Sequence, residues 1–300
     1  MRIDRFIAEE LALFSRSQLK NRAVDIRVNG VEAKPSYRLK LGDRIQVDYE
    51  DEAGTTILPE PIDLDIVFEN DEVVVINKPQ GMVVHPAAGN RSGTLVQGLA
   101  YRWQSIRDEL SSENLRPGIV HRLDKETSGV IIAAKNPEAR RFLANQFRKR
   151  RTAKVYLAIV KGRLYPREGT IESYIRRDPN HRIRFLSDPS VGKYAVTDYE
   201  VLHQWEQHAF VALYPHTGRT HQLRVHMASR NTPVVGDETY ARSDSTLPDA
   251  TLLLHAYRLT IVLPQKTDRP YFYTGGERVT FRAPLPPRFK AAILKLAGRG

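Results

Sequence analysis

The polar segment between residues 118 and 130 is the first place in this chain where side chains could carry out chemistry. It reads Gly-Ile-Val-His-Arg-Leu-Asp-Lys-Glu-Thr-Ser-Gly-Val and places Asp124 between two aliphatic stretches. A carboxylate exposed at a strand end can act as a nucleophile or as a general base. The alternative is a turn in which Asp124 and Thr127 bind backbone donors. Because loops on rigid sheets often carry function, both interpretations stay open.

Two later segments add an aromatic ring and a cation. The segment 154–160 contains Tyr156, but both faces of this expected strand are largely apolar, so a core tyrosine is the default expectation. The segment 214–227 contains Arg224 after a turn with proline and glycine, and Thr220 is the expected N-cap of a helix there. On these residues alone, Tyr156 is a core residue and the segment 214–227 is a turn followed by a helix.

The histidines of the last segment, His216, His221 and His226, raise the question of a metal site. His221 and His226 are five residues apart. They would point roughly 140° apart on a helix and to opposite faces of a strand. We therefore expect no metal here and assign these histidines to capping or solvent-facing positions. The chain also has no cysteine, which excludes thiolate nucleophiles, iron-sulfur clusters and zinc sites built on sulfur.

The charge balance favours a polyanionic partner. Across 300 residues, 46 Lys and Arg exceed 35 Asp and Glu, a formal net charge of +11. Nucleic acid is the partner we expect, ahead of an anionic membrane surface. The longest aliphatic runs, such as 129–134, are too short to cross a bilayer, and the N-terminus mixes both charges without an apolar secretory core. We therefore expect a cytoplasmic protein without membrane contact.

The first fifty residues predict a small domain of their own. Apolar residues at helical spacing start the chain, a basic helix follows, and the Asn29-Gly30 pair predicts a hairpin. Residues 51–64 contain two prolines and a glycine and suit a linker. We predict a small N-terminal domain with its linker at 1–58 and a large domain at 65–300.

Strands dominate the predicted large domain. Two helices stand out, at 137–150 behind a proline and at 287–297 near the C-terminus. Few other helices are expected between the strands, so we predict an α+β domain with a mixed or antiparallel sheet. The expected strands lie at 73–76, 130–134, 155–160, 195–202, 210–214 and 259–263.

Cations gather around the end of the first of these helices. Residues 138–154 contain seven Lys or Arg and one acidic residue, a net charge of +6. Contact with phosphates explains this density better than a solvated helix face, which is the alternative. The candidate contacts are Arg148, Arg150 and Arg151 in this segment and Arg16, Lys20 and Arg22 in the N-terminal unit.

Four short motifs follow one another along the chain. They are Asn-Lys-Pro-Gln-Gly at 77–81, His-Arg-Leu-Asp through glycine at 121–129, Lys-Val-Tyr at 154–156, and Thr-Gly-Arg-Thr-His-Gln-Leu-Arg-Val-His at 217–226. This ordered set resembles the motifs of the RluA/RluD-type pseudouridine synthases. Two later blocks, Gly-Asp at 236–237 and Leu-His-Ala at 254–256, also fit, so the resemblance runs from about residue 65 to the C-terminus. Residues 1–50 resemble the S4 RNA-binding domain.

The resemblance implies a pseudouridine synthase fold, with a central mixed, mainly antiparallel sheet flanked by helices and loops, preceded by a small S4-like domain. It also implies conversion of uridine in RNA to pseudouridine without a cofactor. Asp124 then matches the catalytic aspartate, Arg224 the arginine that pairs with it, with Arg219 as second choice, and Tyr156 the tyrosine that stacks on the target base. A nearby cation would counter the rise in carboxyl pKa that desolvation causes. Attack on the sugar, attack on the base and abstraction of the 2′ proton all stay open.

A uridine inside a helix must leave it to reach such a site, at a cost of about a few kcal/mol. By resemblance Arg122 fills the vacated space, and a planar guanidinium suits stacking between bases. The alternative for Arg122 is an ion pair with Glu126 at i+4. The resemblance adds His121, Arg219 and His221 to the expected RNA contacts.

The expected partner is RNA, and the expected substrate is large-subunit ribosomal RNA, including RNA within the pre-ribosomal large subunit. Transfer RNA is the alternative substrate. A non-catalytic RNA-binding or ribosome-assembly factor would use the same basic surface. A metal-dependent RNA hydrolase built on the histidines is a more distant alternative. The sequence does not identify the uridine, and we expect a monomer.

Overall fold

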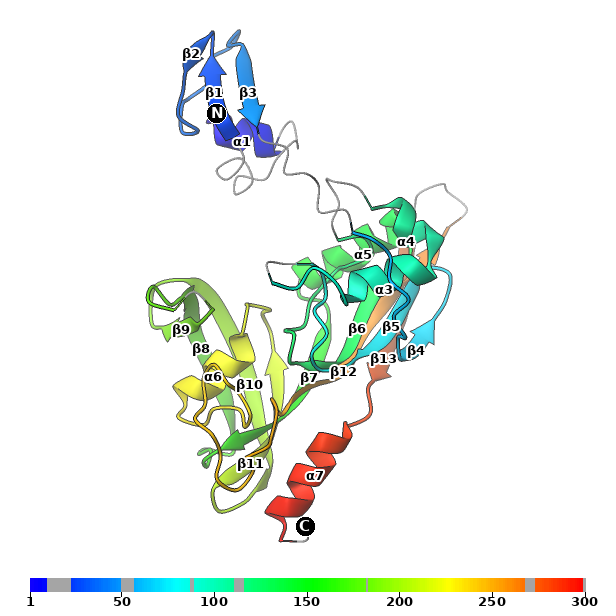
Figure 1. The fold of residues 1–300 in the computed structure, drawn as a ribbon, viewed down its shortest axis with the longest axis vertical. Helices are drawn as coiled ribbons and strands as arrows, with labels where there is room; N and C mark the ends of the chain where they lie inside the picture. The colour runs from blue at the N-terminus through cyan, green and yellow to red at the C-terminus, as the bar shows by residue number, and fades with distance from the viewer. Residues whose placement is uncertain are drawn as a thin grey trace. The chain divides into compact units, whose positions relative to one another are not determined.

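The chain divides into two compact units, Met1–Thr56 and Ile57–Gly300 (Figure 1). The computed structural model describes residues 1–9, 23–49, 57–86, 89–110, 116–181, 183–267 and 273–298. The candidate RNA contacts of the N-terminal unit, Arg16, Lys20 and Arg22, lie outside these residues. Their role stays a prediction, as does the S4-like nature of that unit.

The described part of the first unit consists of a helix and a three-stranded sheet. Helix α1 spans Ile3–Glu9, and strands β1 (Ala23–Val28), β2 (Val31–Glu32) and β3 (Ile45–Tyr49) pair antiparallel in the order β2-β1-β3. Asn29 and Gly30 have φ angles of 53° and 80°, the left-handed backbone that a two-residue hairpin turn requires. The predicted hairpin is therefore confirmed.

A ten-stranded sheet forms the second unit and runs in the order β4-β5-β6-β12-β7-β11-β10-β8-β9, with β13 paired to β12. Its described strands pair antiparallel except β6 and β12, where Ser128 lies opposite His255 in a parallel register. A mixed, mainly antiparallel sheet was predicted and is confirmed. The strands are β4 (Ile66–Glu69), β5 (Val73–Lys78), β6 (Ser128–Ala134), β7 (Ala153–Lys161), β8 (Glu168–Arg177), β9 (Phe185–Asp188), β10 (Lys193–Gln204), β11 (His208–Pro215), β12 (Leu254–Lys266) and β13 (Tyr273–Arg282).

Five described helices accompany this sheet. Helix α5 (Pro137–Arg148) begins where Asn136 accepts the Ala139 amide at 2.8 Å, and α7 (Pro287–Leu296) closes the described chain; both were predicted. The short helices α3 (Leu95–Arg102) and α4 (Gln104–Asp108) and the helix α6 (Gln222–Ser229) complete the set. Within the described residues, no helix has the length and apolar character needed to cross a bilayer.

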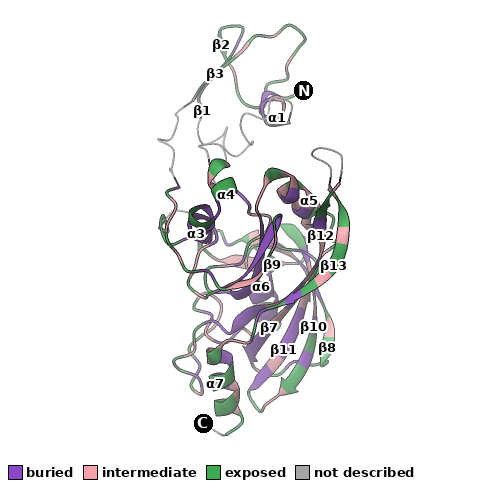
Figure 2. Cartoon of the chain, turned by 90° about the vertical axis from the view of Figure 1, so that its right-hand side faces the viewer, coloured by how far each residue is buried: buried purple, intermediate pink, exposed green. Residues whose placement is uncertain are grey.

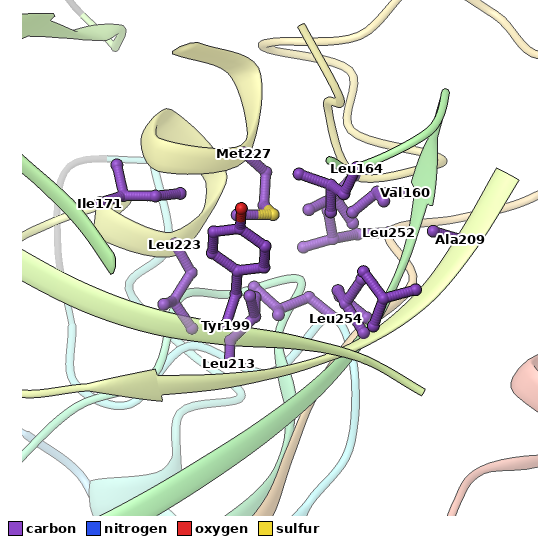
Figure 3. Close-up of a cluster of buried hydrophobic side chains, with 14 residues drawn as sticks. Val160, Leu164, Ile171, Tyr199, Ala209, Leu213, Leu223, Met227, Leu252 and Leu254 are labelled. Carbon is purple, nitrogen blue, oxygen red and sulfur yellow. The ribbon is translucent and has the colours of Figure 1, made fainter. Parts of the chain in front are cut away.

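Two apolar clusters share the core on one side of the central strand β7. One lies under α6, where the Tyr199 ring packs among Leu213, Leu223 and Met227 (Figure 3). The other lies between β5, β6 and the helices α3 and α4. Tyr156 of β7 packs against both clusters, and the central strands around it are mostly buried (Figure 2). Tyr156 therefore stands where the two halves of the domain meet.

Buried histidines predict a loss of stability in acid. His226 is fully buried between Thr197 and Ser173, and burial lowers its pKa from 6.5 to about 4. Between these pH values the His226 imidazole binds a proton in the unfolded chain but stays neutral in the folded chain. The free energy of unfolding therefore falls as the pH drops. We expect His226 to contribute on the order of 3 kcal/mol to the loss between pH 6.5 and 4.

Urea unfolding across this pH range measures the effect. The variant His226→Gln should show a flatter decline of the unfolding free energy than the unmodified chain, whereas His203→Gln, at an exposed histidine, should keep the original slope. Equal slopes for all three proteins would contradict the assignment.

Candidate active site

A cavity of about 500 Å³ in the second unit brings the predicted chemical residues together. Asp124 comes from the loop before β6, Tyr156 from β7, and Arg224 from the first turn of α6, and all three line this cavity. A loop, a strand and a helix that are far apart in sequence contribute one side chain each. The structure thus places a carboxylate, a phenol and a guanidinium around one space.

Asp124 faces two nitrogen-bearing side chains. Its Oδ2 lies 3.5 Å from Arg224 Nη1 and 3.9 Å from His221 Nε2. The Asp124 side chain is 20% exposed, so one side of the carboxylate remains open to the cavity. The contact with Arg224 is loose and leaves the other side of the carboxylate uncovered.

Arg224 itself is held mainly by a second carboxylate. Its Nε and Nη2 each donate to Asp237 at 2.7 Å, its Nη2 also donates to Thr239 Oγ1 at 2.9 Å, and its guanidinium lies 5.1 Å from the centre of the Tyr240 ring. Burial opposes the charge, but Asp237 and Asp124 outweigh it and raise the pKa of Arg224. The sequence pointed to Asp124 as the partner of Arg224; the structure shows that Asp237 makes the closer, two-bond pair.

Tyr156 presents a protonated phenol. Burial, and secondarily the charge of Asp124, raises its pKa far above the ordinary value. A tyrosine in this state can stack and can donate a hydrogen bond, but it is not a phenolate at neutral pH. Its packing against the two apolar clusters holds it in the wall of the cavity that Asp124 also lines.

His221 occupies the N-cap of α6, where Thr220 was predicted. The prediction for Thr220 is wrong because His221 takes the left-handed backbone, with a φ of 55°, just before the helix. Its Nδ1 lies 2.9 Å from the Tyr240 hydroxyl. Burial lowers the pKa of His221, and the charge of Asp124 opposes this shift. His221 is therefore fixed against Tyr240 and turns its other nitrogen toward Asp124.

The other histidines near the cavity have separate partners. His121 lines the wall, where its Nε2 accepts the Ile132 amide at 3.0 Å and its ring stacks on Phe147; burial lowers its pKa to about 3. His216 pairs with Asp198 at 2.5 Å in an exposed position. The ring nitrogen of His121 that bonds to the sheet is thus already occupied, and its expected RNA contact stays a prediction.

The Asn-Lys-Pro-Gln-Gly motif forms a cradle beneath the Asp124 loop. The fully buried Lys78 donates to the carbonyls of Pro79, Met82 and Lys125 at 2.8, 2.9 and 3.1 Å. Gln80 donates to the Glu126 carbonyl at 3.0 Å. Burial lowers the pKa of Lys78 to about 7, against the opposing charges of Glu126 and Asp124. The sequence identified this motif as part of a family pattern but did not predict its hydrogen bonds to the backbone of the Asp124 loop.

A close approach of two strands fixes the far end of the same loop. Gly129 has a φ of 115°, and a Cβ there would lie only 2.2 Å from the Ala256 carbonyl oxygen. Only glycine fits both this backbone and this distance. The loop therefore enters the sheet at one defined point.

Cations dominate the walls and mouth of the cavity. The exposed Arg122 makes no ion pair with Glu126 among the described residues, so that alternative for Arg122 is not observed. Arg219 donates to the Tyr194 carbonyl at 3.1 Å, and Arg151 is exposed but lies outside the lining. The lining holds one carboxylate, Asp124, and six cations: Arg122, Arg148, Arg150, Lys154, Arg219 and Arg224. Such a surface attracts a polyanion.

Comparison with known proteins gives a consistent result. A family model described as RNA pseudouridylate synthase matches residues 72–229. The chain is 43% identical over 267 residues to "Ribosomal large subunit pseudouridine synthase D" of Borreliella burgdorferi, covering 87% of this chain and 82% of that protein. It is 40% identical to an "Uncharacterized RNA pseudouridine synthase" of Aquifex aeolicus, covering 97% and 92%. The solved structure "Human RNA Pseudouridylate Synthase Domain Containing 4" is similar with a TM-score of 0.57 and 27% identity, covering 78% and 93%.

Because the pair of Arg224 and Asp237 is buried, we expect the substitution Asp237→Asn to destabilise the fold strongly. Asp237→Asn leaves a guanidinium that is 9% exposed without its fully buried carboxylate. We expect the unfolding free energy to fall by about 3 kcal/mol, as for other broken buried pairs. The matched control is Asp198→Asn, which changes the partner of His216. The Asp198 side chain is 41% exposed, so the unfolding free energy should fall by less than about 1 kcal/mol. Chemical denaturation measures both, and equal losses would contradict the central place given to Asp237.

Proposed function

The chain belongs to the RNA pseudouridylate synthase family, of the RluA/RluD type, and is an RNA pseudouridine synthase; from this we propose that Asp124 is its catalytic residue and that large-subunit ribosomal RNA is its substrate. The observation that carries the first part is the convergence of Asp124, Arg224 and Tyr156 on one cavity. The half-open carboxylate is the nucleophile or base of the cavity, and it lies 3.5 Å from the Arg224 guanidinium.

The three side chains have distinct tasks in this proposal. The target uridine leaves its helix and enters the cavity, where the Tyr156 ring stacks on the base; stacking of this kind contributes about 1–3 kcal/mol. Asp124 acts on the sugar or the base through its open side. Arg224 holds the negative charge of Asp124 in place during the reaction because Asp237 fixes its orientation from behind.

In this proposal the basic residues that line the cavity bind the RNA backbone. Arg122 is exposed at the cavity and free of Glu126, so its planar guanidinium is available to occupy the space that the uridine leaves. Arg148, Arg150 and Arg219 line the same cavity and suit contacts with phosphates. Arg151, outside the lining, suits a contact with more distant phosphates.

The choice of substrate is supported by relatives and by charge. Relatives at 43% and 39% identity carry the name "Ribosomal large subunit pseudouridine synthase D". The proposed S4-like domain, residues 1–58 with its linker, would add a second point of attachment to structured RNA, ahead of the catalytic domain at 65–300. Transfer RNA is the alternative substrate.

The role of Asp124 predicts a variant that binds but does not react. Asp124→Asn keeps the shape of the side chain and removes its charge, so we expect turnover to fall on the order of a thousandfold or more while the Kd for RNA changes less than about threefold. Pseudouridine formation in a ribosomal RNA fragment and filter binding measure the two quantities. The matched control Asp63→Asn, at an exposed aspartate outside the cavity, should behave as the unmodified enzyme. Undiminished turnover of Asp124→Asn would refute the assignment.

The substrate class predicts a specific loss in cells. Cells without this protein should lack one or more pseudouridines in large-subunit ribosomal RNA and keep those of transfer RNA, when both are mapped by chemical labelling and sequencing. Expression of the unmodified enzyme should restore the missing sites, and expression of Asp124→Asn should not. A loss confined to transfer RNA would establish the alternative substrate instead.

A further inference from the structure

A chain of hydrogen bonds joins the closing helix α7 to the end of the Asp124 loop. Arg288, in the first turn of α7, donates from Nη2 to the Ser128 hydroxyl at 2.5 Å. Ser128 is 3% exposed, begins β6, and follows Asp124 by four residues. The Ser128 hydroxyl lies 2.8 Å from His255 Nδ1, and His255 Nε2 lies 3.4 Å from the Ala283 carbonyl.

The chemistry of these groups gives the chain one direction. A carbonyl oxygen can only accept, so His255 Nε2 carries the ring proton and donates it to Ala283. The Nδ1 of the neutral ring therefore accepts the hydrogen of the Ser128 hydroxyl, and the Ser128 oxygen accepts from Arg288, since a guanidinium can only donate. Burial lowers the pKa of His255 to about 4, so the ring is neutral at physiological pH and this arrangement is stable. Every hydrogen in the chain is thus assigned.

These hydrogen bonds give the Asp124 loop a second anchor. Lys78 and Gln80 hold the backbone of Lys125 and Glu126, on the side of the loop nearer to Asp124. Arg288 and His255 hold Ser128 at the other side, immediately before the close contact of Gly129 with β12. Both anchors lie on the C-terminal side of Asp124, at residues 125–126 and at residue 128, so together they fix the segment that leaves Asp124 and enters β6.

The placement of Arg288 is costly for a purely packing role. Burial lowers the pKa of Arg288, and the charge of Glu126 only partly offsets this. Its Nε is buried without a hydrogen-bond partner among the described residues. Phe289, which is fully buried, already docks α7 into the core. A helix that needed only docking would not require a half-buried guanidinium on a serine hydroxyl.

From these contacts we propose that Arg288, acting through Ser128 and with His255, is a positioning residue for Asp124, so that α7 is a working part of the active site. The proposal rests on the catalytic role proposed above for Asp124. His255 and Arg288 both lie beyond residues 72–229, the part of the chain that the family model matches. The hydrogen bonds of Arg288, Ser128 and His255 therefore extend the proposed active site into the C-terminal part of the polypeptide.

The test compares turnover, binding and stability in four variants of the full chain: Arg288→Ala, Arg288→Lys, Ser128→Ala and the double variant Arg288→Ala with Ser128→Ala. We expect Arg288→Ala to lower the single-turnover rate of pseudouridine formation about tenfold, with the Kd for RNA unchanged. The double variant should be no slower than the slower single variant, because both changes break the same chain. Guanidinium ions at millimolar concentration should restore part of the rate of Arg288→Ala and none of Ser128→Ala. Lys290→Gln, on the exposed face of α7, is the matched control and should keep the full rate.

The outcomes separate this proposal from its premise. If the unmodified enzyme makes pseudouridine, Asp124→Asn does not, and Arg288→Ala reacts at the full rate, the positioning role is refuted and the catalytic role of Asp124 stands. Additive losses in the double variant, or a loss that only follows the unfolded fraction seen by circular dichroism, would also overturn it. If Arg288→Ala does not fold, a full rate in the folded Ser128→Ala variant refutes the proposal, and a tenfold loss with unchanged binding supports it. A failure of Asp124→Asn to reduce turnover would instead overturn the premise.

Discussion

One guanidinium shared between two carboxylates constrains the whole site. Asp237 takes the two short bonds of Arg224, and Asp124 receives only a contact of 3.5 Å. If Asp237 were absent, Asp124 would be the nearest carboxylate to the buried cation, and a tight pair would cover the carboxylate that we propose acts on the substrate. The buried pair therefore orients the cation and keeps one face of Asp124 open at the same time. The rest of the geometry depends on this unequal sharing of one positive charge between the buried Asp237 and the partly exposed Asp124.

The second constraint is that the loop carrying Asp124 is held through its backbone. Lys78, Gln80 and Gly81 contact carbonyls of Lys125 and Glu126, and their own positions are fixed by the end of β5. Contacts with carbonyls restrict where the loop lies without restricting which side chains it presents. The loop can thus carry charged residues such as Lys125 and Glu126, whose side chains are exposed, and still place Asp124 reproducibly.

Much of the fold and the outline of the site could be predicted from the sequence. Apolar runs predicted six of the ten strands of the second unit, and β4, β8, β9 and β13 were missed. The Asn29-Gly30 pair and the proline at the start of α5 predicted the hairpin and the helix, because these signals are local. The motifs pointed to Asp124, Tyr156 and Arg224, which line one cavity. The two-bond pair with Asp237 and the cradle around Lys78 were not foreseen, since they join distant segments and depend on side-chain directions. Thr220 failed as a cap because a left-handed backbone at the next residue, His221, starts the helix instead.

The parallel pairing of β6 with β12 has a consequence for how the enzyme comes into being. Between these neighbouring strands the chain makes an excursion that includes α5, β7 to β11 and α6, and this excursion carries both Tyr156 and Arg224. The sheet closes only when β12 arrives, and Arg288 follows later still. Contacts between segments so distant in sequence form slowly and late. The cavity that Tyr156 and Arg224 line is therefore complete only after β12, which contributes Leu254 to its lining, has paired with β6 and β7.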